Sequence, residues 1–312
     1  MSRAPDSVAA PARAAWTDGR VARSPLGRRV RRLFVRLFER PRGRLATAGV
    51  VVLVLAALCA PWLTPYDPSA QLGIETLAGR APSLAHPFGT DPYSRDVLSR
   101  VLYGARVSLS VAVISTLLSM TVATLYGAVA GFRGGAVDAL MMRVVDGAMA
   151  VPRVLLLLAV GALWGGLTRL QLVLLLGLTQ WFPVSRLVRA EVLVARGEEY
   201  VTSARALGAS EWRVLFRHVL PNVLSPVLVA ATIGVSNVVA LEAGLSYLGF
   251  GIRPPAPSWG NIIQDGSDQV ANLWWVSLFP GLAIVLTVAC FTALGDALRD
   301  VTETRQGVGE RG

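Results

Sequence analysis

Lysine is absent from this chain of 312 residues, because all thirty of its basic residues are arginine. A nucleotide-binding loop of the GxxxxGK[ST] type needs its lysine to contact the β- and γ-phosphates of the nucleotide. The sequence therefore excludes a standard P-loop ATPase site. It excludes a catalytic lysine Schiff base for the same reason.

Cysteine and histidine are nearly as scarce. Cys59 and Cys290 both fall within apolar runs and lie far apart, which favours packing roles over a disulfide or a metal site. The two histidines, His86 and His218, fall on opposite sides of the membrane in the topology derived below, so they cannot form a metal cluster. No nucleophile has a recognisable catalytic setting. We therefore predict no catalytic residue, no metal and no cofactor in this chain.

Charge is also scarce, since 16% of the residues are charged, 53% are hydrophobic and the mean hydropathy is +0.53. A helix needs about 20 apolar residues to cross a hydrocarbon core of about 30 Å. Two uncharged runs, 154–168 and 170–185, are shorter than that and span only if flanking residues join them. The runs that reach this length are 45–66, 107–132, 219–241 and 269–295. The sequence predicts an all-α integral membrane protein with six transmembrane helices. A re-entrant hairpin or a buried core helix is the alternative for the short pair, because two glycines and Arg169 mark a tight turn between them.

The arginines predict the orientation of the chain. The first 44 residues carry twelve arginines against three acids, and the segment 186–218 carries six more. By the positive-inside rule, both termini and this segment face the cytoplasm, whereas the loops 65–104 and 250–268 face outward. The arginine-rich stretch 28–40 also has apolar residues at helical spacing, which predicts an amphipathic helix on anionic lipid. The first apolar run starts too late for a signal peptide, and we expect it to be retained.

Ionisable residues inside predicted spans mark either a pathway or a structural pair. Arg143 and Asp146 are three residues apart in the third span, which favours a local ion pair. Arg153 either extends toward the cytoplasmic interface or faces a pathway, where it would meet a substrate carboxylate. Glu242, at the outer end of the fifth span, either lines an outer vestibule or is satisfied by a neighbouring helix.

The cytoplasmic segment around Gly208 reads as two short helices. Gly208 suits a left-handed cap after the first helix, and Ser210 suits the start of the second. Pro221 is expected to end the second helix at the membrane. We therefore expect a short helix after Gly208 whose apolar face docks into a partner's groove. A helical hairpin on the membrane surface is the alternative.

Twelve residues separate Gly208 from Pro221, and this arrangement between the fourth and fifth spans resembles the coupling loop, or EAA loop, of ABC importer permeases. The segments "HPFGTDPYSRDVLSRVLYGARVSLSV" (86–111) and "LEAGLSYLGFGIRPPAPSWGNII" (241–263) are similar to the C-type permease subunit of dipeptide, oligopeptide and nickel importers. The resemblance covers residues 45 to 300 and leaves out the first 44. Two positions depart from it: Thr202 replaces the glutamate that names the loop, with Glu198 and Glu199 nearby, and Arg153 follows Pro152 where a small or apolar residue is more usual.

The resemblance implies the ABC type-1 permease fold and a division of the chain. The parts are a cytoplasmic tail (1–44), a first transmembrane helix (45–66), an extracytoplasmic loop (67–103), a five-helix transmembrane domain (104–299) with the coupling loop at about 188–221, and a cytoplasmic tail (300–312). The residues expected to couple to the ATPase are Arg205, Gly208, Ala209, Glu211, Arg213, Leu220 and Pro221.

The resemblance also implies a function and partners. The chain would be a permease subunit in a bacterial plasma membrane, importing dipeptides or oligopeptides, with nickel or another small solute as the alternative. Its partners would be a second related permease subunit, two ATP-binding subunits and an extracytoplasmic substrate-binding protein. That protein would land on the loop starting at His86 and on 253–260, where Trp259 would offer an interfacial contact; these segments could instead simply close the outer face.

Two other classes of function fit less well. An ion-coupled secondary transporter predicts paired carboxylates within the membrane and inverted repeats, and the sequence has neither pattern. A scaffold protein without transport would not need the docking helix.

Overall fold

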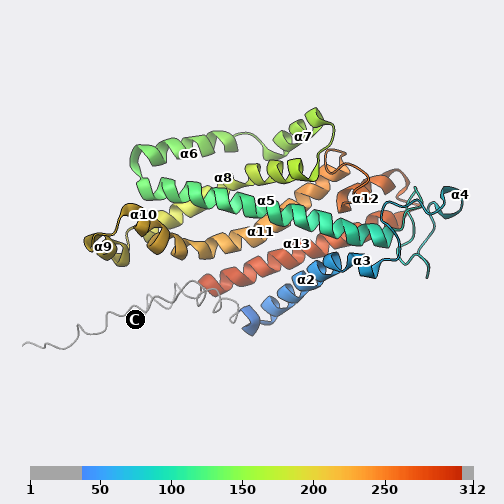
Figure 1. Ribbon diagram of the computed structural model, residues 1–312, viewed down its shortest axis with the longest axis horizontal. Coiled ribbons are helices and arrows are strands. Elements are labelled where there is room, and N and C mark those ends of the chain that lie inside the picture. The colour runs from blue at the N-terminus through green and yellow to red at the C-terminus, as the bar shows by residue number, and fades with distance from the viewer. Residues whose placement is uncertain (1–36, 304–312) are drawn as a thin grey trace, which may run out of the picture.

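The computed structural model describes residues 37–303, and this part of the chain is built from helices that run roughly along one axis (Figure 1). Five helices are long and apolar enough to cross a membrane, and a bent pair raises the number to six if it forms one crossing. The crossing helices are α2 (Pro41–Leu58), α5 (Val97–Arg133), the pair α6 (Gly135–Met149) and α7 (Arg153–Trp164), α8 (Arg169–Ala195), α11 (Leu220–Tyr247) and α13 (Trp274–Glu303). The short elements are α3 (Ala60–Leu63), α4 (Ile74–Leu77), α9 (Glu199–Ala206), α10 (Glu211–Val214), the π-helix η1 (Leu215–Val219), α12 (Trp259–Gly266) and the 3₁₀-helix η2 (Ser267–Gln269).

The two short apolar runs behave differently from each other. The run 170–185 lies within α8, which has 27 residues and is long enough to cross alone. The run 154–168 forms α7, which has only 12 residues and is joined to α6 at an angle of 68°. The break falls at Pro152, because proline has no N–H to donate and keeps the preceding residue out of the helical conformation. If α6 and α7 form one crossing, that crossing is a broken helix that begins at Gly135; a re-entrant loop is the alternative for this pair.

Helix boundaries at the amino-terminal end also differ from the expected ones. α2 begins at Pro41, in the first helical turn where proline is favoured, and it ends at a break near Cys59. α5 begins at Val97 because the side chain of Asp96 caps it by accepting a hydrogen bond from the N–H of Ser99 at 2.8 Å. The outer loop is therefore shorter than predicted. The predicted amphipathic helix falls almost entirely outside the described residues.

Pro221 does not end a helix, and this prediction was wrong. α10, η1 and α11 form one continuous rod from Glu211 to Tyr247. A proline within a helix removes one backbone hydrogen bond and crowds the preceding turn. Here the wider π-helical turn of η1 comes directly before it, which gives the ring room. Burial of Leu215, Val219 and Val223 along one side holds the rod straight against its neighbours.

The centre of the bundle is α5, and its contact with α8 depends on glycine. A Cβ atom on Gly127 would lie 2.3 Å from the carbonyl oxygen of Ser185, and one on Gly131 would lie 2.8 Å from that of Arg189. These two glycines are four residues apart and share one face of α5, as in small-xxx-small helix pairs in membranes. On α8, Gly177 faces the carbonyl oxygen of Ser115 in the same way. Small residues thus set the distance between the two helices.

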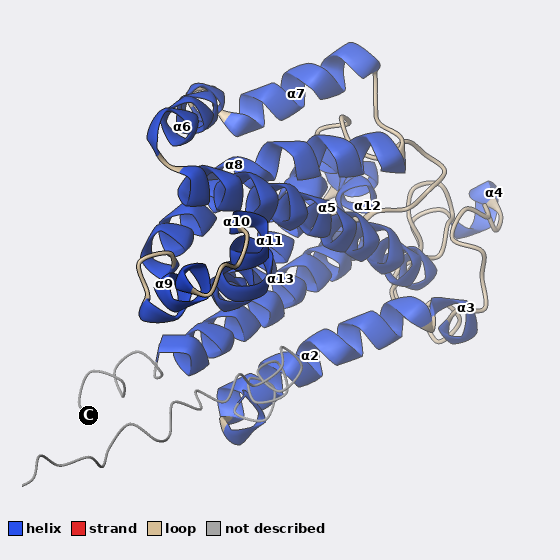
Figure 2. Cartoon of the chain, turned by 60° about the vertical axis from the view of Figure 1, so that its left-hand side comes forward, coloured by secondary structure: helices blue, strands red, loops and turns tan. Residues whose placement is uncertain are grey.

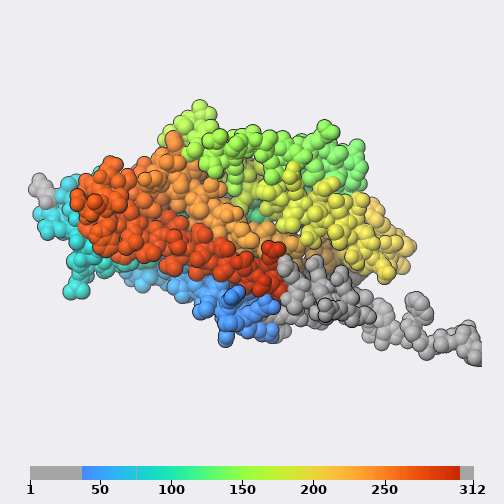
Figure 3. All heavy atoms as spheres, turned by 180° about the vertical axis from the view of Figure 1, so that it is seen from behind, coloured from blue at the N-terminus to red at the C-terminus, as the bar shows by residue number. Residues whose placement is uncertain are grey.

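The periphery of the bundle is apolar and exposed. In the most apolar stretch of α5, 61% of the residues are buried, against 17% in α2 and 22% in α13. α2 and α13 lie side by side (Figure 2), and Arg40 of the segment before α2 binds Asp300 near the end of α13 at 2.9 Å. From behind, α11 and α13 form one broad face with α2 along its edge (Figure 3). Such a face suits lipid chains or another membrane helix.

The glycine contact between α5 and α8 makes a first prediction. Replacing Gly127 with valine places a methine carbon on the carbonyl oxygen of Ser185, and we expect the free energy of unfolding to fall by at least about 2 kcal/mol. Gly147→Val is the matched control, because nothing lies within 4 Å of its added Cβ. Thermal unfolding of the purified protein in detergent measures both. Equal melting temperatures for the two variants would contradict the proposed close packing.

Candidate functional site

A compact structure projects from one end of the bundle, opposite α4 and α12 (Figure 1). It consists of α9, the turn after it and α10, and we call these residues, 199–214, the elbow. The turn is a Schellman motif: the N–H of Gly208 donates to the carbonyl oxygen of Arg205 at 2.9 Å, and that of Ala209 donates to the carbonyl oxygen of Ala204 at 3.1 Å. Gly208 has φ +79°, a conformation that costs a residue with a Cβ atom about 1–2 kcal/mol. The predicted left-handed cap is therefore confirmed.

A bidentate ion pair between Arg205 and Glu211 closes this turn. Arg205 donates from Nε and Nη2 to the two carboxylate oxygens of Glu211, each at 3.1 Å. The guanidinium of Arg205 also lies over the ring of Phe132, at 5.4 Å from its centroid. Because Phe132 belongs to α5, this stacking connects the tip of the elbow to the central helix of the bundle.

An apolar cluster fixes the elbow to the bundle. Val201 and Ala204 of α9 and Val214 of α10 are buried against the ends of α5 and α8. A second contact ties α9 to α11, since the amide of Asn222 donates to the hydroxyl of Tyr200 at 3.1 Å. The elbow is therefore a packed extension of the bundle, and a force on it is transmitted without first bending a loop.

A groove of about 770 Å³ lies between the elbow and the helix ends. Its floor includes apolar side chains of α5 and α8, and its rim carries Arg133, Arg196 and the Arg205–Glu211 pair. Arg133 lies over the ring of Trp212 at 5.6 Å, and Arg196 donates to the carbonyl oxygen of Gly131 at 3.0 Å, which caps the end of α5. The groove and the tip of the elbow together offer a surface that is both apolar and positively charged.

The predicted coupling residues are only partly brought together. Arg205, Gly208, Ala209 and Glu211 form the turn and its ion pair, as the contacts above describe. Arg213 is exposed on α10, whereas Leu220 and Pro221 lie in the first turn of α11 and are half-buried. Ser210 precedes α10, but its side chain makes no capping hydrogen bond. A short helix with exposed residues does follow Gly208, as α10, but it continues into η1 and α11 without a stop, and the separate short helix α9 precedes Gly208.

One elbow residue was missed by the sequence reasoning. Leu207, directly before Gly208, is 87% exposed at the tip, and the stacked rings of Trp212 and Phe216 are about half exposed. A large apolar side chain at a helix end next to a left-handed glycine is the signal that could have identified it. Nothing in the described part of the chain covers this leucine, so it is available to a partner.

The two candidate pathway residues make separate structural contacts. Arg153, at the start of α7, donates to the hydroxyl of Thr179 at 3.2 Å and to the carbonyl oxygen of Leu176 at 3.0 Å, both on α8. Glu242 is fully buried and accepts hydrogen bonds from Ser108 on α5 and Ser246 on α11, each at 2.7 Å. Of the two interpretations of Glu242, the structure favours the one in which a neighbouring helix satisfies it. Both residues join helices to each other.

Two further expectations are corrected. Asp146 pairs with Arg186 on α8 and not with Arg143 on its own helix, so α6 is held by a contact across the bundle. Trp259 is 1% exposed and its indole N–H donates to the carbonyl oxygen of Val101 at 3.0 Å, so it cannot serve as an exposed landing contact. Ser258 and the N3 residue Asn261 form a capping box that starts α12 and turns this tryptophan inward.

The comparisons with known proteins fit this architecture. Residues 123–308, more than half of the chain, match the family model described as "Binding-protein-dependent transport system inner membrane component". The chain belongs to this permease family. Residues 26–86 also match the N-terminal transmembrane domain of oligopeptide transport permease C. The likeness therefore extends to residue 26, and our expectation that the first 44 residues lie outside it was wrong for residues 26–44.

Relatives of the permease are similar over most of its length. It is 40% identical over 272 residues to a protein of Brucella suis named as a peptide transport system permease, which covers 86% of this chain and 90% of that protein. A glutathione transport system permease protein of Pectobacterium atrosepticum is 37% identical over 276 residues, with 88% and 91% covered. The family is a component of transport systems, and the helical fold is that of an ABC type-1 permease.

The ion pair of the elbow makes a second prediction. The side chains of Arg205 and Glu211 are 39% and 63% exposed, so water screens their attraction. In a double-mutant cycle of Arg205→Ala and Glu211→Ala, we expect a coupling energy below about 1 kcal/mol, measured by thermal unfolding in detergent. The pair would then orient the turn without supporting the bundle. A coupling above about 2 kcal/mol would contradict this.

Proposed function

We propose that this permease is a membrane-spanning subunit of an ATP-driven importer of short peptides. Its likeness to proteins named as peptide and glutathione permeases supports this substrate class, since glutathione is itself a tripeptide. The observation that carries the mechanism is the elbow. It combines an exposed apolar tip at Leu207 with a turn that is packed onto α5 and α8. A partner bound to the tip could therefore move the helices through this packed turn.

The energy for transport comes from partner chains in this proposal. Two ATP-binding subunits would bind the elbow and its counterpart on a second related permease subunit, and a substrate-binding protein would deliver the peptide from outside. The absence of lysine supports the assignment of ATP hydrolysis to other chains, because a standard P-loop requires that residue. This chain would have no catalytic residue, metal or cofactor of its own, and it would act as a non-enzymatic subunit.

The proposed location is the bacterial plasma (inner) membrane, with both termini and the elbow in the cytoplasm. The arginine distribution supports this orientation, since arginines gather in the first 44 residues and in 186–218. The loop before α5 and the segment around α12 would then face the binding protein. The division of the chain into tails, outer loop and transmembrane domain follows the same orientation.

Co-reconstitution tests the proposed function directly. The permease, the second membrane subunit and the ATPases are placed in proteoliposomes, and uptake of a labelled dipeptide or tripeptide is followed with the binding protein and ATP. We expect uptake only when all components and ATP are present. Full uptake without the ATPase subunits, driven by an ion gradient, would overturn the proposal.

The turn of the elbow makes a third prediction. Gly208→Val forces a β-branched residue into a left-handed conformation, so the turn must refold and the elbow must tilt. We expect peptide uptake to fall at least tenfold, while the ATPases remain bound and continue to hydrolyse ATP. Gly147→Val is the matched control, since this exposed glycine lies outside the elbow and the groove, needs no positive φ and has no atom within 4 Å of its added Cβ. Wild-type uptake by Gly208→Val would contradict the role of the turn.

The exposed tip makes a fourth prediction. Leu207→Asp replaces an apolar contact with a charge, and we expect the permease to retain about tenfold less ATPase during affinity purification. Stability should change by less than about 0.5 kcal/mol, because the side chain is 87% exposed. Leu84→Asp, an equally exposed leucine in the loop at the other end, is the control. If both variants retain the ATPase equally well, the tip does not dock.

A further inference from the structure

The end of the bundle opposite the elbow holds a second, smaller cavity of about 140 Å³. Its walls come from the start of α5, the turn between α7 and α8, the segment after α11 and the helix α12. Arg100 and Asn261 line it from inside, and Arg253 and Pro255 are exposed at its rim. In the orientation proposed above, this cavity opens on the side from which substrate arrives.

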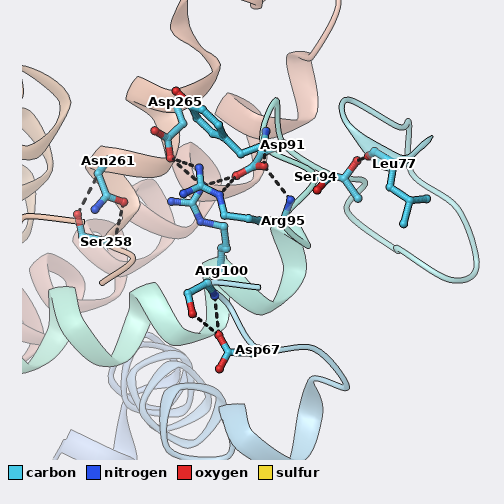
Figure 4. A network of polar contacts seen from close by, with 12 residues as sticks. Asp67, Leu77, Asp91, Ser94, Arg95, Arg100, Ser258, Asn261 and Asp265 are labelled. Atoms are coloured by element: carbon cyan, nitrogen blue, oxygen red, sulfur yellow. Dashed lines mark hydrogen bonds and ion pairs between the residues drawn. The ribbon is translucent and has the colours of Figure 1, made fainter. Parts of the chain in front are cut away.

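Two arginines and two aspartates form a network beside the cavity (Figure 4). The guanidinium groups of Arg95 and Arg100 lie between the carboxylates of Asp91 and Asp265. Arg95 binds Asp91 through Nε at 2.6 Å and Asp265 through Nη2 at 2.7 Å, and Arg100 binds Asp265 through Nη1 at 2.8 Å. Asp91 also accepts the backbone N–H groups of Tyr93 and Arg95, each at 2.9 Å. Its hydrogen-bonding capacity is therefore largely used.

The guanidinium of Arg100, by contrast, uses little of its hydrogen-bonding capacity. It is 2% exposed, and the hydrogen bonds and ion pairs of its side chain within residues 37–303 all go through Nη1. Its Nε is buried and has no hydrogen-bond partner in this part of the chain. Leaving a buried donor unpaired is costly, so native proteins rarely do so without a reason. The unused edge of the guanidinium, formed by Nε and Nη2, is the fork that binds a carboxylate through two parallel hydrogen bonds.

The charge and shape of the cavity suit a small anion. Arg95, Arg100 and Arg253 line it against the single acid Asp265, and Asp91 lies behind the wall, so positive charge remains in excess. Gly165, on the opposite wall, has φ +59° and no atom within 4 Å of an added Cβ, which leaves the approach open. The volume holds a carboxylate with a few attached atoms, while a longer molecule would extend out past Arg253.

We propose that this cavity binds the free carboxylate of an incoming peptide on the unused edge of Arg100. The identity of the ligand rests on the proposed function, whereas the preference for a carboxylate rests on the geometry alone. Asp265 opposes a bound anion, because its carboxylate already binds Nη2 of Arg95 and Nη1 of Arg100 beside the proposed edge. Replacing it with asparagine removes that negative charge from the same guanidinium.

The test measures binding without the substrate-binding protein, which has its own preferences. The intact complex of both permease subunits and the ATPases is placed in nanodiscs, and saturation-transfer NMR follows alanylalanine, its C-amidated form and acetate. We expect alanylalanine and acetate to bind and the amide to bind at least tenfold more weakly. Asp265→Asn should tighten the binding of both carboxylates about tenfold, since a like charge beside the site disfavours an anion. Arg253→Gln should weaken it a few-fold.

Asp146→Asn is the matched control, because it breaks an arginine–aspartate pair between α6 and α8 and should change none of these affinities. Arg100→Gln should abolish binding, but the Asp265 variant decides the question even if that protein fails to fold. Equal binding of acid and amide, or no change in Asp265→Asn, would overturn the proposal. If acetate binds and alanylalanine does not, the cavity does not take a peptide.

The two proposals fail separately. If the complex imports peptide but no carboxylate binds the cavity, only the proposed site is refuted. If carboxylates bind in a way that depends on Asp265 but no peptide is imported, only the proposed function is refuted.

Discussion

The rest of this structure depends on the close contact between α5 and α8. In a hydrocarbon solvent, apolar side chains gain nothing by leaving lipid for protein, so helices associate through close packing and polar contacts. Gly127 and Gly131 allow the backbone of α5 to reach carbonyl oxygens of α8, and no larger residue could replace them without moving a helix. Hydroxyl groups strengthen the same contact, since Ser115 on α5 donates to the carbonyl oxygen of Val173 at 3.1 Å.

The membrane also explains why polar groups inside the bundle need hydrogen-bond partners, because lipid chains offer them none. Charged side chains between the helices bind groups on other elements, as Glu242 does with Ser108 and Arg153 with Thr179. An unpaired group there would cost several kcal/mol, so these residues join helices and need not mark a route for substrate. The positively charged cavity near α12 differs, because its buried arginine has a donor to spare.

Much of the fold could be predicted from the sequence, because the length and apolar character of a run are local properties. The run 170–185 was recognised in this way, and Gly208 was recognised because a left-handed turn needs glycine. Errors arose where a distant contact decided the outcome. Asp146 pairs with Arg186, forty residues away, and burial of Leu215 and Val219 carries the helix past a proline. Neither contact leaves a pattern in the nearby sequence.

The candidate sites were likewise predicted from the sequence only where their residues are close together in the chain. The turn at Gly208 was predicted because a left-handed helix cap needs glycine, whereas a role in coupling was expected from the family resemblance. The cavity beside Arg100 was not predicted, because its walls come from four segments that only the fold brings together. Trp259 was misread since an aromatic residue in an outer loop suggests an interface. The capping-box pair Ser258 and Asn261, three residues apart, was the local signal that α12 begins there and turns the ring inward.

Helix α5 joins the two ends of the molecule, as does the rod from Glu211 to Tyr247. α5 has 37 residues and is therefore about 55 Å long. Arg100, in its first turn, faces the cavity near α12, and Phe132, in its last turn, carries the guanidinium of Arg205. We expect a displacement of the elbow to shift Arg100 as well, because a long helix transmits movement from one end to the other. In the proposed site, the ligand binds the Nε–Nη2 edge of Arg100 while Asp265 binds Nη1 of the same guanidinium, so two negative charges lie next to each other. Any movement that weakens the Asp265 contact therefore favours the ligand, and a bound ligand favours that movement by the same amount.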